Sequence, residues 1–322
     1  MAQQSSLRVA AIQLETKIAD VTANLQACER LALQALEAGA EWIALPEFFN
    51  SGVNFSDEML SAIETENGPS ATFLQQFSAQ HQVVIGGSFL CRLTKSDGSP
   101  GGVRNRYLCF NKGELVGYHD KDLPTMWEAA YYENGEAGDD GVLGDIDGIR
   151  TGTAVCWEFL RSQTSRRLQG KIDVLIGGSH WWSIPENWPA WLTHSMEARN
   201  QENVIATVQH SARLIGCPVI HASHCGHFEG RHPSVPFMPY RGQLEGQAAI
   251  IDGHGNLLAH RSREQGEGFV IADITPENVS NQEPIPDNYW LRKRGVLPTF
   301  SWIADGFVGR LWYKKNVLNK SL

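Results

Sequence analysis

The chain has 322 residues, of which 42% are hydrophobic and 20% are charged, and its formal net charge is −9. This composition is ordinary for a globular protein, and the acidic balance argues against a general role on nucleic acids or membrane surfaces, which require clustered Lys and Arg. The apolar runs are strand-sized and the N-terminus has no basic segment before a long apolar one, so we expect neither a membrane span nor a signal peptide. The six cysteines do not resemble a disulfide framework, which predicts a cytoplasmic protein with reduced thiols.

Short apolar runs and helical patterns alternate along the first half of the chain. The runs that predict buried strands are 7–15, 41–49 and 82–90. Asp20 can cap a helix that ends near Gly39, and a second helical pattern lies near 69–81. Two further apolar runs flank the tripeptide Asn-Lys-Gly at 111–113, which predicts a β-hairpin.

The second half repeats this alternation. Its predicted strands are 148–158, 173–180, 219–224 and 268–274, and its predicted helices are 160–170 and about 188–203. The second of these helices is expected to lead into a separate apolar segment at 203–210, and a hairpin is predicted over 246–262. Alternating strands and helices predict the α/β class, with both faces of the sheets largely covered.

The chain has no Pro-, Gly- or Ser-rich linker that would divide it into two domains, and no repeat of solenoid period. We therefore expect one domain, residues 1–275. Residues 276–322 contain several prolines and aromatic side chains. This composition predicts a C-terminal arm that packs on the domain or at a subunit interface.

Three residues that can carry chemistry each lie at the end of a predicted strand. Glu47 follows Pro46, Lys121 follows the hairpin, and Cys156 ends the strand 148–158. Alone, each has an ordinary interpretation: a solvated carboxylate, a surface ammonium and a buried filler thiol. Together they supply a nucleophile, a base for its proton and a cation that stabilises an anionic intermediate. Such a set suits acyl transfer from a carbon–nitrogen bond.

The order and spacing of Glu47, Lys121 and Cys156 resemble the Glu-Lys-Cys triad of the nitrilase superfamily of carbon–nitrogen hydrolases. The resemblance runs from residue 7 to residue 274 and includes shorter matching segments. These are RVAAIQ near the N-terminus, Asn105, Gly113, Gly117 and Tyr118 before the lysine, EARNQEN at 197–203, and DGHGNLLA at 252–259. The resemblance implies that residues 1–275 form a carbon–nitrogen hydrolase domain.

The resemblance also implies a fold, an assembly and a fourth residue. The fold is a four-layer α-β-β-α sandwich, which usually pairs, so a homodimer or higher homo-oligomer is expected. The segment EAAYYENG (128–135) is similar to the family's E-x-x-Y-F-x-x-G, which indicates Glu128 as a second glutamate that holds Lys121 and orients substrate or water. Glu133 and Glu136 are interpreted as solvated loop residues. The implied mechanism requires no metal and no cofactor.

In this mechanism Cys156 attacks the substrate carbon while Glu47 accepts the thiol proton. Lys121 and the backbone N–H of Trp157 stabilise the developing anion, and a thioester forms and is hydrolysed. Glu158, although close to Cys156 in sequence, is not expected to be the base. The partners are water and a small amide, carbamoyl compound or nitrile.

The bond that is cut is less well specified. An amidase-type enzyme is favoured, because Glu47 lies in LPEFF and the residues after CWE lack the N-x-x-P continuation of true nitrilases. A nitrilase is the alternative, because KDLPTMWE (121–128) resembles their K-x-x-P-T-x-x-E segment and CWE their nucleophile context. A catalytically silent binding protein on the same fold is a second alternative, although the four residues of the site are intact.

The segment GGSHWWSIPENWPAW (177–191) predicts a tight, aromatic-lined pocket. Trp157, His180 and Trp181 are the predicted substrate contacts. The alternative is that most of the tryptophans in this segment pack in the core or at a subunit interface instead of contacting substrate. Four potential metal ligands also gather between residues 221 and 227, namely His221, His224, Cys225 and His227. Their spacing fits no standard zinc module, and alternation along a strand would direct them to both faces, so structural roles are favoured.

Overall fold

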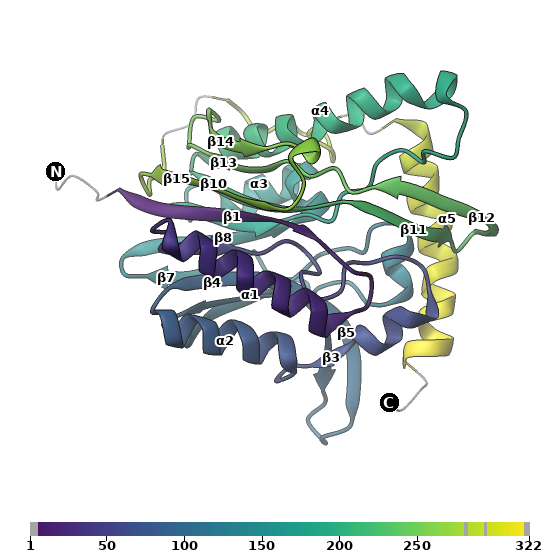
Figure 1. Ribbon diagram of the computed structural model, residues 1–322, viewed down its shortest axis with the longest axis horizontal. Coiled ribbons are helices and arrows are strands. Elements are labelled where there is room, and N and C mark those ends of the chain that lie inside the picture. The colour runs from purple at the N-terminus through teal and green to yellow at the C-terminus, as the bar shows by residue number, and fades with distance from the viewer. Residues whose placement is uncertain (1–5, 280–282, 293–294, 319–322) are drawn as a thin grey trace.

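The computed structural model describes residues 6–279, 283–292 and 295–318 and shows strands and helices stacked in layers (Figure 1). Thirteen strands form one continuous sheet in which β1 (Leu7–Glu15) joins two halves. The first half contains β2 (Trp42–Ala44), β3 (Glu64–Thr65), β4 (Val84–Thr94), β5 (Pro100–Asn111), β6 (Glu114–Asp120) and β15 (Gly268–Ile274). The second half contains β7 (Val142–Ile146), β8 (Ile149–Val155), β9 (Val174–Gly178), β10 (Val219–Cys225), β13 (Ala248–Ile251) and β14 (Leu257–Arg261).

The order of the central strands is β6-β5-β4-β2-β1-β10-β9-β8-β7, so β6 and β7 lie at its two ends. β1 pairs in parallel with β2 at Val9–Ala11, and it pairs in parallel with β10 at Gln13–Glu15. The chain therefore passes from one half of the sheet to the other along a single strand. The two halves pack against each other, which brings β6 and β7 into contact without strand pairing among the described residues.

Both faces of the sheet are buried, as alternation along β1 shows. Leu7, Val9 and Ala11 pack between the two halves of the sheet. The intervening Ala10 and Ile12 pack beneath helices α1 (Val21–Glu37) and α2 (Pro69–His81), because successive strand side chains point to opposite faces. Helices α3 (Ser162–Leu168) and α4 (Ala190–Ile215) cover the other half. The predicted four-layer α-β-β-α sandwich is confirmed.

The local signals in the sequence correspond to real turns and caps. The Asp20 side chain accepts a hydrogen bond from the Ala23 N–H at 3.0 Å and caps α1. The β5–β6 hairpin turns at Lys112 and Gly113, which have φ values of 53° and 89°. Such positive φ values belong to the two-residue turns that match the twist of paired strands.

Helix α4 is longer than the sequence pattern indicates. It continues through the segment 203–210 and ends at Ile215, where Gly216 adopts φ 84°. Val204, Val208 and Ala212 lie four residues apart and are buried on the same side of the helix. Tertiary packing of this stripe overrides the short β-branched run that suggested a break.

The C-terminal residues form helix α5 (Val296–Tyr313) and a final turn η5 (Lys314–Leu318), which the sequence did not predict as helical. α5 packs against the 3₁₀ helix η2 (Met126–Ala130), and the Trp302 Nε1–H donates to the Pro124 carbonyl at 3.1 Å. In Figure 1 it runs beside the hairpin of β11 (His227–His232) and β12 (Val235–Gln243). Among the described residues, no helix combines the length and the apolar character that a membrane crossing requires.

Candidate active site

The four residues of the predicted site come from separate parts of the fold and are brought together in the structure. Glu47 follows β2, Lys121 directly follows β6, Cys156 directly follows β8, and Glu128 lies in η2. Each of these side chains is at most 1% exposed. The Cys156 Sγ and one carboxylate oxygen each of Glu47 and Glu128 lie within 4.8 Å of one another. A thiol, an ammonium and two carboxylates thus share one buried site.

Lys121 joins the two carboxylates. Its Nζ lies 2.7 Å from Glu47 Oε1 and 2.7 Å from Glu128 Oε2, and it also donates to Thr125 Oγ1 at 3.2 Å. Burial opposes the charged form of Lys121, but Glu128 and Glu47 outweigh it and raise the pKa of this side chain well above the ordinary value. Lys121 is therefore an ammonium throughout the physiological pH range.

Glu47 is held in one orientation by three separate contacts. Oε1 accepts from Asn105 Nδ2 at 2.9 Å, and Oε2 accepts from the backbone N–H of His180 at 3.0 Å. The ring of His224 lies with Nε2 2.6 Å from the Glu47 carbonyl oxygen. Asn105 was among the residues that carry the family resemblance, whereas the role of His224 had no signal in the sequence. The carboxylate is thereby fixed toward the thiol.

The two carboxylate oxygens of Glu128 differ in their hydrogen-bond partners. Its Oε2 accepts from Lys121, from the Thr125 N–H at 2.9 Å and from the Tyr132 hydroxyl, whereas its Oε1 is buried and has no hydrogen-bond partner among the described residues. Burial raises the pKa of Glu128 to about 7, although Lys121 opposes the shift. The Thr-x-x-Glu spacing of residues 125 and 128 is a capping-box signal that points to the Thr125 contact from the sequence alone.

Cys156 lies where β8 turns sharply into the 3₁₀ helix η3 (Cys156–Leu160). Its φ is 55°, a left-handed conformation that is costly for a residue with a side chain and that often marks functional positions. Burial and the nearby Glu47 raise the pKa of the thiol well above its ordinary value, and Lys121 only partly opposes them. The resting group is therefore a thiol, and a base beside it is needed to form a nucleophile.

A cavity of about 110 Å³ is lined by residues next in sequence to Cys156 and Glu128, although none of the four site residues is itself among the lining residues. Its aromatic walls are Trp127, Trp157, Trp181, Trp182, Trp188 and Tyr240. Trp157 is the neighbour of Cys156 along the chain, and Trp127 is the neighbour of Glu128. Trp157 and Trp181, two of the three predicted substrate contacts, line this cavity, and their contact with a substrate stays a prediction. Trp191 is 85% exposed and is not among the lining residues.

His180, the third predicted substrate contact, is hydrogen bonded to Glu47 through its backbone N–H and is not among the residues that line the cavity. Its Nε2 accepts from the Val53 N–H at 3.3 Å, and its ring packs on that of His224 with centroids 4.8 Å apart. Burial and His224 lower the pKa of His180 well below its ordinary value, so the ring is neutral. Its backbone N–H orients Glu47, and its contact with a substrate stays a prediction.

The four potential zinc ligands around residue 224 do not gather in the part of the chain that the structure describes. His221 Nε2 lies 2.9 Å from Ser179 Oγ, and His224 contacts Glu47, so both rings have structural partners. Three ligand atoms close enough for one ion are found at Glu47, Glu128 and Cys156, where the Lys121 ammonium already binds both carboxylates. A second such group consists of His119, Asp122 and Glu158. The structural interpretation of the histidines therefore holds for His221 and His224.

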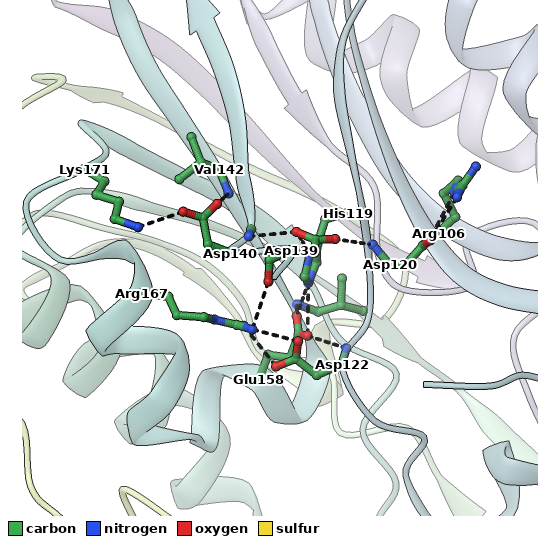
Figure 2. A network of polar contacts seen from close by, with 12 residues as sticks. Arg106, His119, Asp120, Asp122, Asp139, Asp140, Val142, Glu158, Arg167 and Lys171 are labelled. Atoms are coloured by element: carbon green, nitrogen blue, oxygen red, sulfur yellow. Dashed lines mark hydrogen bonds and ion pairs between the residues drawn. The ribbon is translucent and has the colours of Figure 1, made fainter. Parts of the chain in front are cut away.

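The second of these groups belongs to a charged network (Figure 2) that the sequence did not reveal. Glu158 is fully buried, and both its oxygens lie 3.0 Å from His119 Nε2. The other ring nitrogen, Nδ1, lies 2.8 Å from Asp139 Oδ1. Burial opposes protonation of His119, but the two carboxylates prevail and raise its pKa to about 10. The ring is therefore an imidazolium between two carboxylates at neutral pH.

This network predicts a pH-dependent stability. Because the pKa of His119 is raised in the folded state, its stabilisation is complete below the unfolded value near 6.5 and is lost as the pH rises through about 10. Urea unfolding of the wild type and of His119→Gln at pH 6, 8 and 10 should give free energies of unfolding that converge toward pH 10. A difference that is independent of pH would contradict the assignment.

A layered α/β sandwich with a buried thiol, an ammonium and two carboxylates, three of these groups just after strands, is the arrangement of a hydrolase that acts on carbon–nitrogen bonds. The chain belongs to the carbon–nitrogen hydrolase family, whose family model matches residues 8–283.

Individual relatives agree with this membership. The chain is 27% identical to the deaminated glutathione amidase of Synechocystis sp., over 84% of this chain and 92% of the relative. It is 29% identical to nitrilase homolog 2 of Dictyostelium discoideum, over 78% of this chain and 70% of the relative. The crystal structure of a carbon–nitrogen hydrolase from Helicobacter pylori G27 has the same fold, with a TM-score of 0.68 at 19% identity over 84% of this chain and 89% of that one.

Proposed function

We propose that this hydrolase cleaves non-peptide carbon–nitrogen bonds with Cys156 as its nucleophile and that it is an amidase-type enzyme. One observation carries the proposal: the Cys156 thiol lies within 4.8 Å of carboxylate oxygens of Glu47 and Glu128, and Lys121 binds both carboxylates. These groups supply the nucleophile, the base and the cation of an acyl transfer through a thioester.

The first half-reaction starts from the thiol form of Cys156. Glu47 takes the thiol proton as Sγ bonds to the amide carbon, and the electron pair of the carbonyl moves onto its oxygen. Lys121 and the Trp157 N–H stabilise this oxyanion, and removing one such donor typically costs about 3 kcal/mol of transition-state stabilisation. When the oxyanion collapses, the carbon–nitrogen bond breaks, and Glu47 gives its proton to the leaving nitrogen. Ammonia or an amine departs and a thioester remains.

The second half-reaction returns the enzyme to its resting state. Glu47 takes a proton from water as the water oxygen bonds to the thioester carbon, and the same donors stabilise the second oxyanion. The carbon–sulfur bond then breaks, the carboxylic acid leaves, and the proton on Glu47 returns to the Cys156 sulfur. Glu128 holds Lys121 throughout. Its unpartnered Oε1 is available to a substrate N–H or to the attacking water.

Two observations bear on the choice between amide and nitrile substrates. The relative named an amidase matches over more of its own length than the relative named a nitrilase homolog, 92% against 70%. The segment from Lys121 to Glu128 and the CWE context, however, resemble those of nitrilases. An amidase is therefore the proposal and a nitrilase the second candidate.

Ammonia release from matched substrates tests the proposal. We expect purified protein to release ammonia and acid from primary amides or carbamoyl compounds, and to do so poorly from the nitriles of the same acids. Preference for the nitriles would instead establish the second candidate. Absence of turnover across aliphatic and aromatic amides, carbamoyl amino acids and nitriles would favour a silent binding protein.

The same set of substrates probes the aromatic cavity. An acyl group that fills a cavity lined by tryptophan rings should gain apolar burial, so phenylacetamide is expected to exceed acetamide in kcat/KM by about 10–100-fold. Equal values would indicate that the acyl group does not enter this cavity.

We also propose a cytoplasmic homodimer or higher homo-oligomer, with residues 276–322 as an arm that contributes to the subunit interface. Helix α5 supports this proposal, because it carries a stripe of exposed apolar side chains at helical spacing. The stripe consists of Val296, Phe300, Ile303, Phe307 and Leu311. Light scattering on the purified protein measures the assembly, and a monomer would contradict it.

A further inference from the structure

Glu158 makes two backbone contacts beside the proposed catalytic groups. Its Oε2 accepts from the Val155 N–H at 2.8 Å, and its Oε1 accepts from the Asp122 N–H at 2.8 Å. Val155 immediately precedes Cys156, and Asp122 immediately follows Lys121. One buried carboxylate is therefore hydrogen bonded to both chain segments that present the nucleophile and the ammonium.

The sheet itself does not make this connection. Lys121 follows β6, which lies at one end of the central strand order, whereas Cys156 follows β8, next to the other end. In the described residues β6 pairs with β5, and β8 pairs with β7 and β9, so no strand pairing joins the two segments directly. The two segments are instead linked through side chains, among them the carboxylate of Glu158.

The carboxylate is itself fixed and kept charged. His119 lies 3.0 Å from both oxygens, and Asp139 anchors the far side of the imidazolium (Figure 2). His119 lies in β6, two residues before Lys121, so the ion pair ties the same two segments a second time. Arg167 binds the side chain of Asp122 at 2.8 and 2.9 Å and neutralises that carboxylate. The Glu158 carboxylate is thus charged, buried and rigid. These properties favour strong hydrogen bonds from backbone N–H groups.

We propose that Glu158 is a positioning residue for the hydrolysis: by binding the backbone on either side it sets the distance between the Lys121 ammonium and the Cys156 sulfur and holds Cys156 at its positive φ. This inference rests on the proposed function. Displacement of reacting groups by about 1 Å can cost about 100-fold in rate, so loss of this link should lower kcat while substrate binding is largely kept.

Glu158→Gln tests the inference with a side chain of the same shape. A neutral amide has one oxygen, so it can accept from only one of the two N–H groups and presents its own N–H₂ to the other. We expect kcat to fall by about 100-fold and KM to change by less than about threefold. The double variant His119→Gln/Glu158→Gln removes both buried charges together, so the inference can still be tested if the single variant fails to fold. The double variant should show the same loss of kcat.

Arg167→Gln is the matched control, because it removes a charge from the same network but leaves both hydrogen bonds of Glu158 to the backbone. It should lower the free energy of unfolding and leave kcat within about threefold of the wild type. A double variant of His119 and Glu158 with wild-type kcat would overturn the inference. So would a loss of kcat in Arg167→Gln as large as that in Glu158→Gln, because the network would then act only through stability.

A second measurement does not depend on substrate. Alkylation of Cys156 by iodoacetamide, followed by mass spectrometry of its peptide, should slow in both Glu158 variants and not in Arg167→Gln, since thiol deprotonation requires the placed Glu47. Unchanged alkylation in the Glu158 variants would overturn the inference. Failure of the proposed function would appear separately, as wild-type protein that releases no ammonia from any substrate.

Discussion

Replacement of Cys156 by alanine is expected to abolish turnover, with kcat reduced by about 10⁵-fold or more, while the protein remains folded. The magnitude follows from losing the proposed nucleophile, because the remaining groups of such a site cannot support the covalent route. The fold should persist because the substitution removes one buried sulfur atom from a side chain that makes no disulfide. Ammonia release and thermal unfolding measure the two parts of the prediction.

Cys109→Ala is the matched control for this variant. Cys109 is as deeply buried as Cys156, in the same core between the two halves of the sheet, and burial raises its pKa to about 12. It lies within β5, and burial alone accounts for its raised pKa. Its loss should leave kcat unchanged. Cys156→Ala with more than about 1% of wild-type kcat would show that another group is the nucleophile.

The sequence could group Glu47, Lys121 and Cys156 because each follows a predicted strand. The periodicity of 7–15 and 148–158 is a local signal of burial on both faces, and the carboxyl ends of such strands converge in α/β sheets. Glu47, Lys121 and Cys156 could therefore be grouped before any contact was known. Glu128 followed from the resemblance of its segment to the family.

The charged network shows what such reasoning misses. Glu158 is only two residues from Cys156, but its partners His119 and Asp122 are 39 and 36 residues away along the chain. No periodicity marks a long-range hydrogen bond between a side chain and a backbone N–H. The sequence assigns the role of base to Glu47, far upstream of Cys156, and gives Glu158 no role of its own. Its buried position and its partners emerge only when the two ends of the sheet meet.

The C-terminal half of α4 and helix α5 were missed for a different reason. Val204 and Ile205 favour strands locally, but burial at i, i+4 and i+8 along α4 determines the outcome. α5 exposes much of its apolar face, so its pattern of large hydrophobic residues resembled an irregular arm more than a helix with a buried stripe.

Lys121→Met is expected to impair both catalysis and stability, because the ammonium is the proposed oxyanion donor and also binds two buried carboxylates. Loss of an oxyanion donor should lower kcat by about 10²–10³-fold. The same change leaves Glu47 and Glu128 buried together without their cation, and breaking a buried ion pair from one side typically costs about 3–5 kcal/mol. Assays of ammonia release and urea unfolding separate the two effects.

The destabilisation by Lys121→Met should depend on pH in a direction that the site defines. Burial already raises the pKa of Glu128 to about 7, and removing Lys121, which opposes that shift, raises it further. A carboxyl whose pKa is higher in the folded state binds more protons there, so the free energy of unfolding falls as the pH rises above the unfolded value near 4.5. The Lys121→Met variant should therefore be closer in stability to the wild type at pH 6 than at pH 8.

Adding Glu128→Gln to Lys121→Met should restore most of the lost stability at pH 8 without restoring kcat, because the second buried carboxylate is gone but the oxyanion donor is still missing. Equal stability of the single and double variants at pH 8 would mean that Lys121 does not stabilise the fold through Glu128, and recovery of kcat would mean that Lys121 is not the donor to the oxyanion.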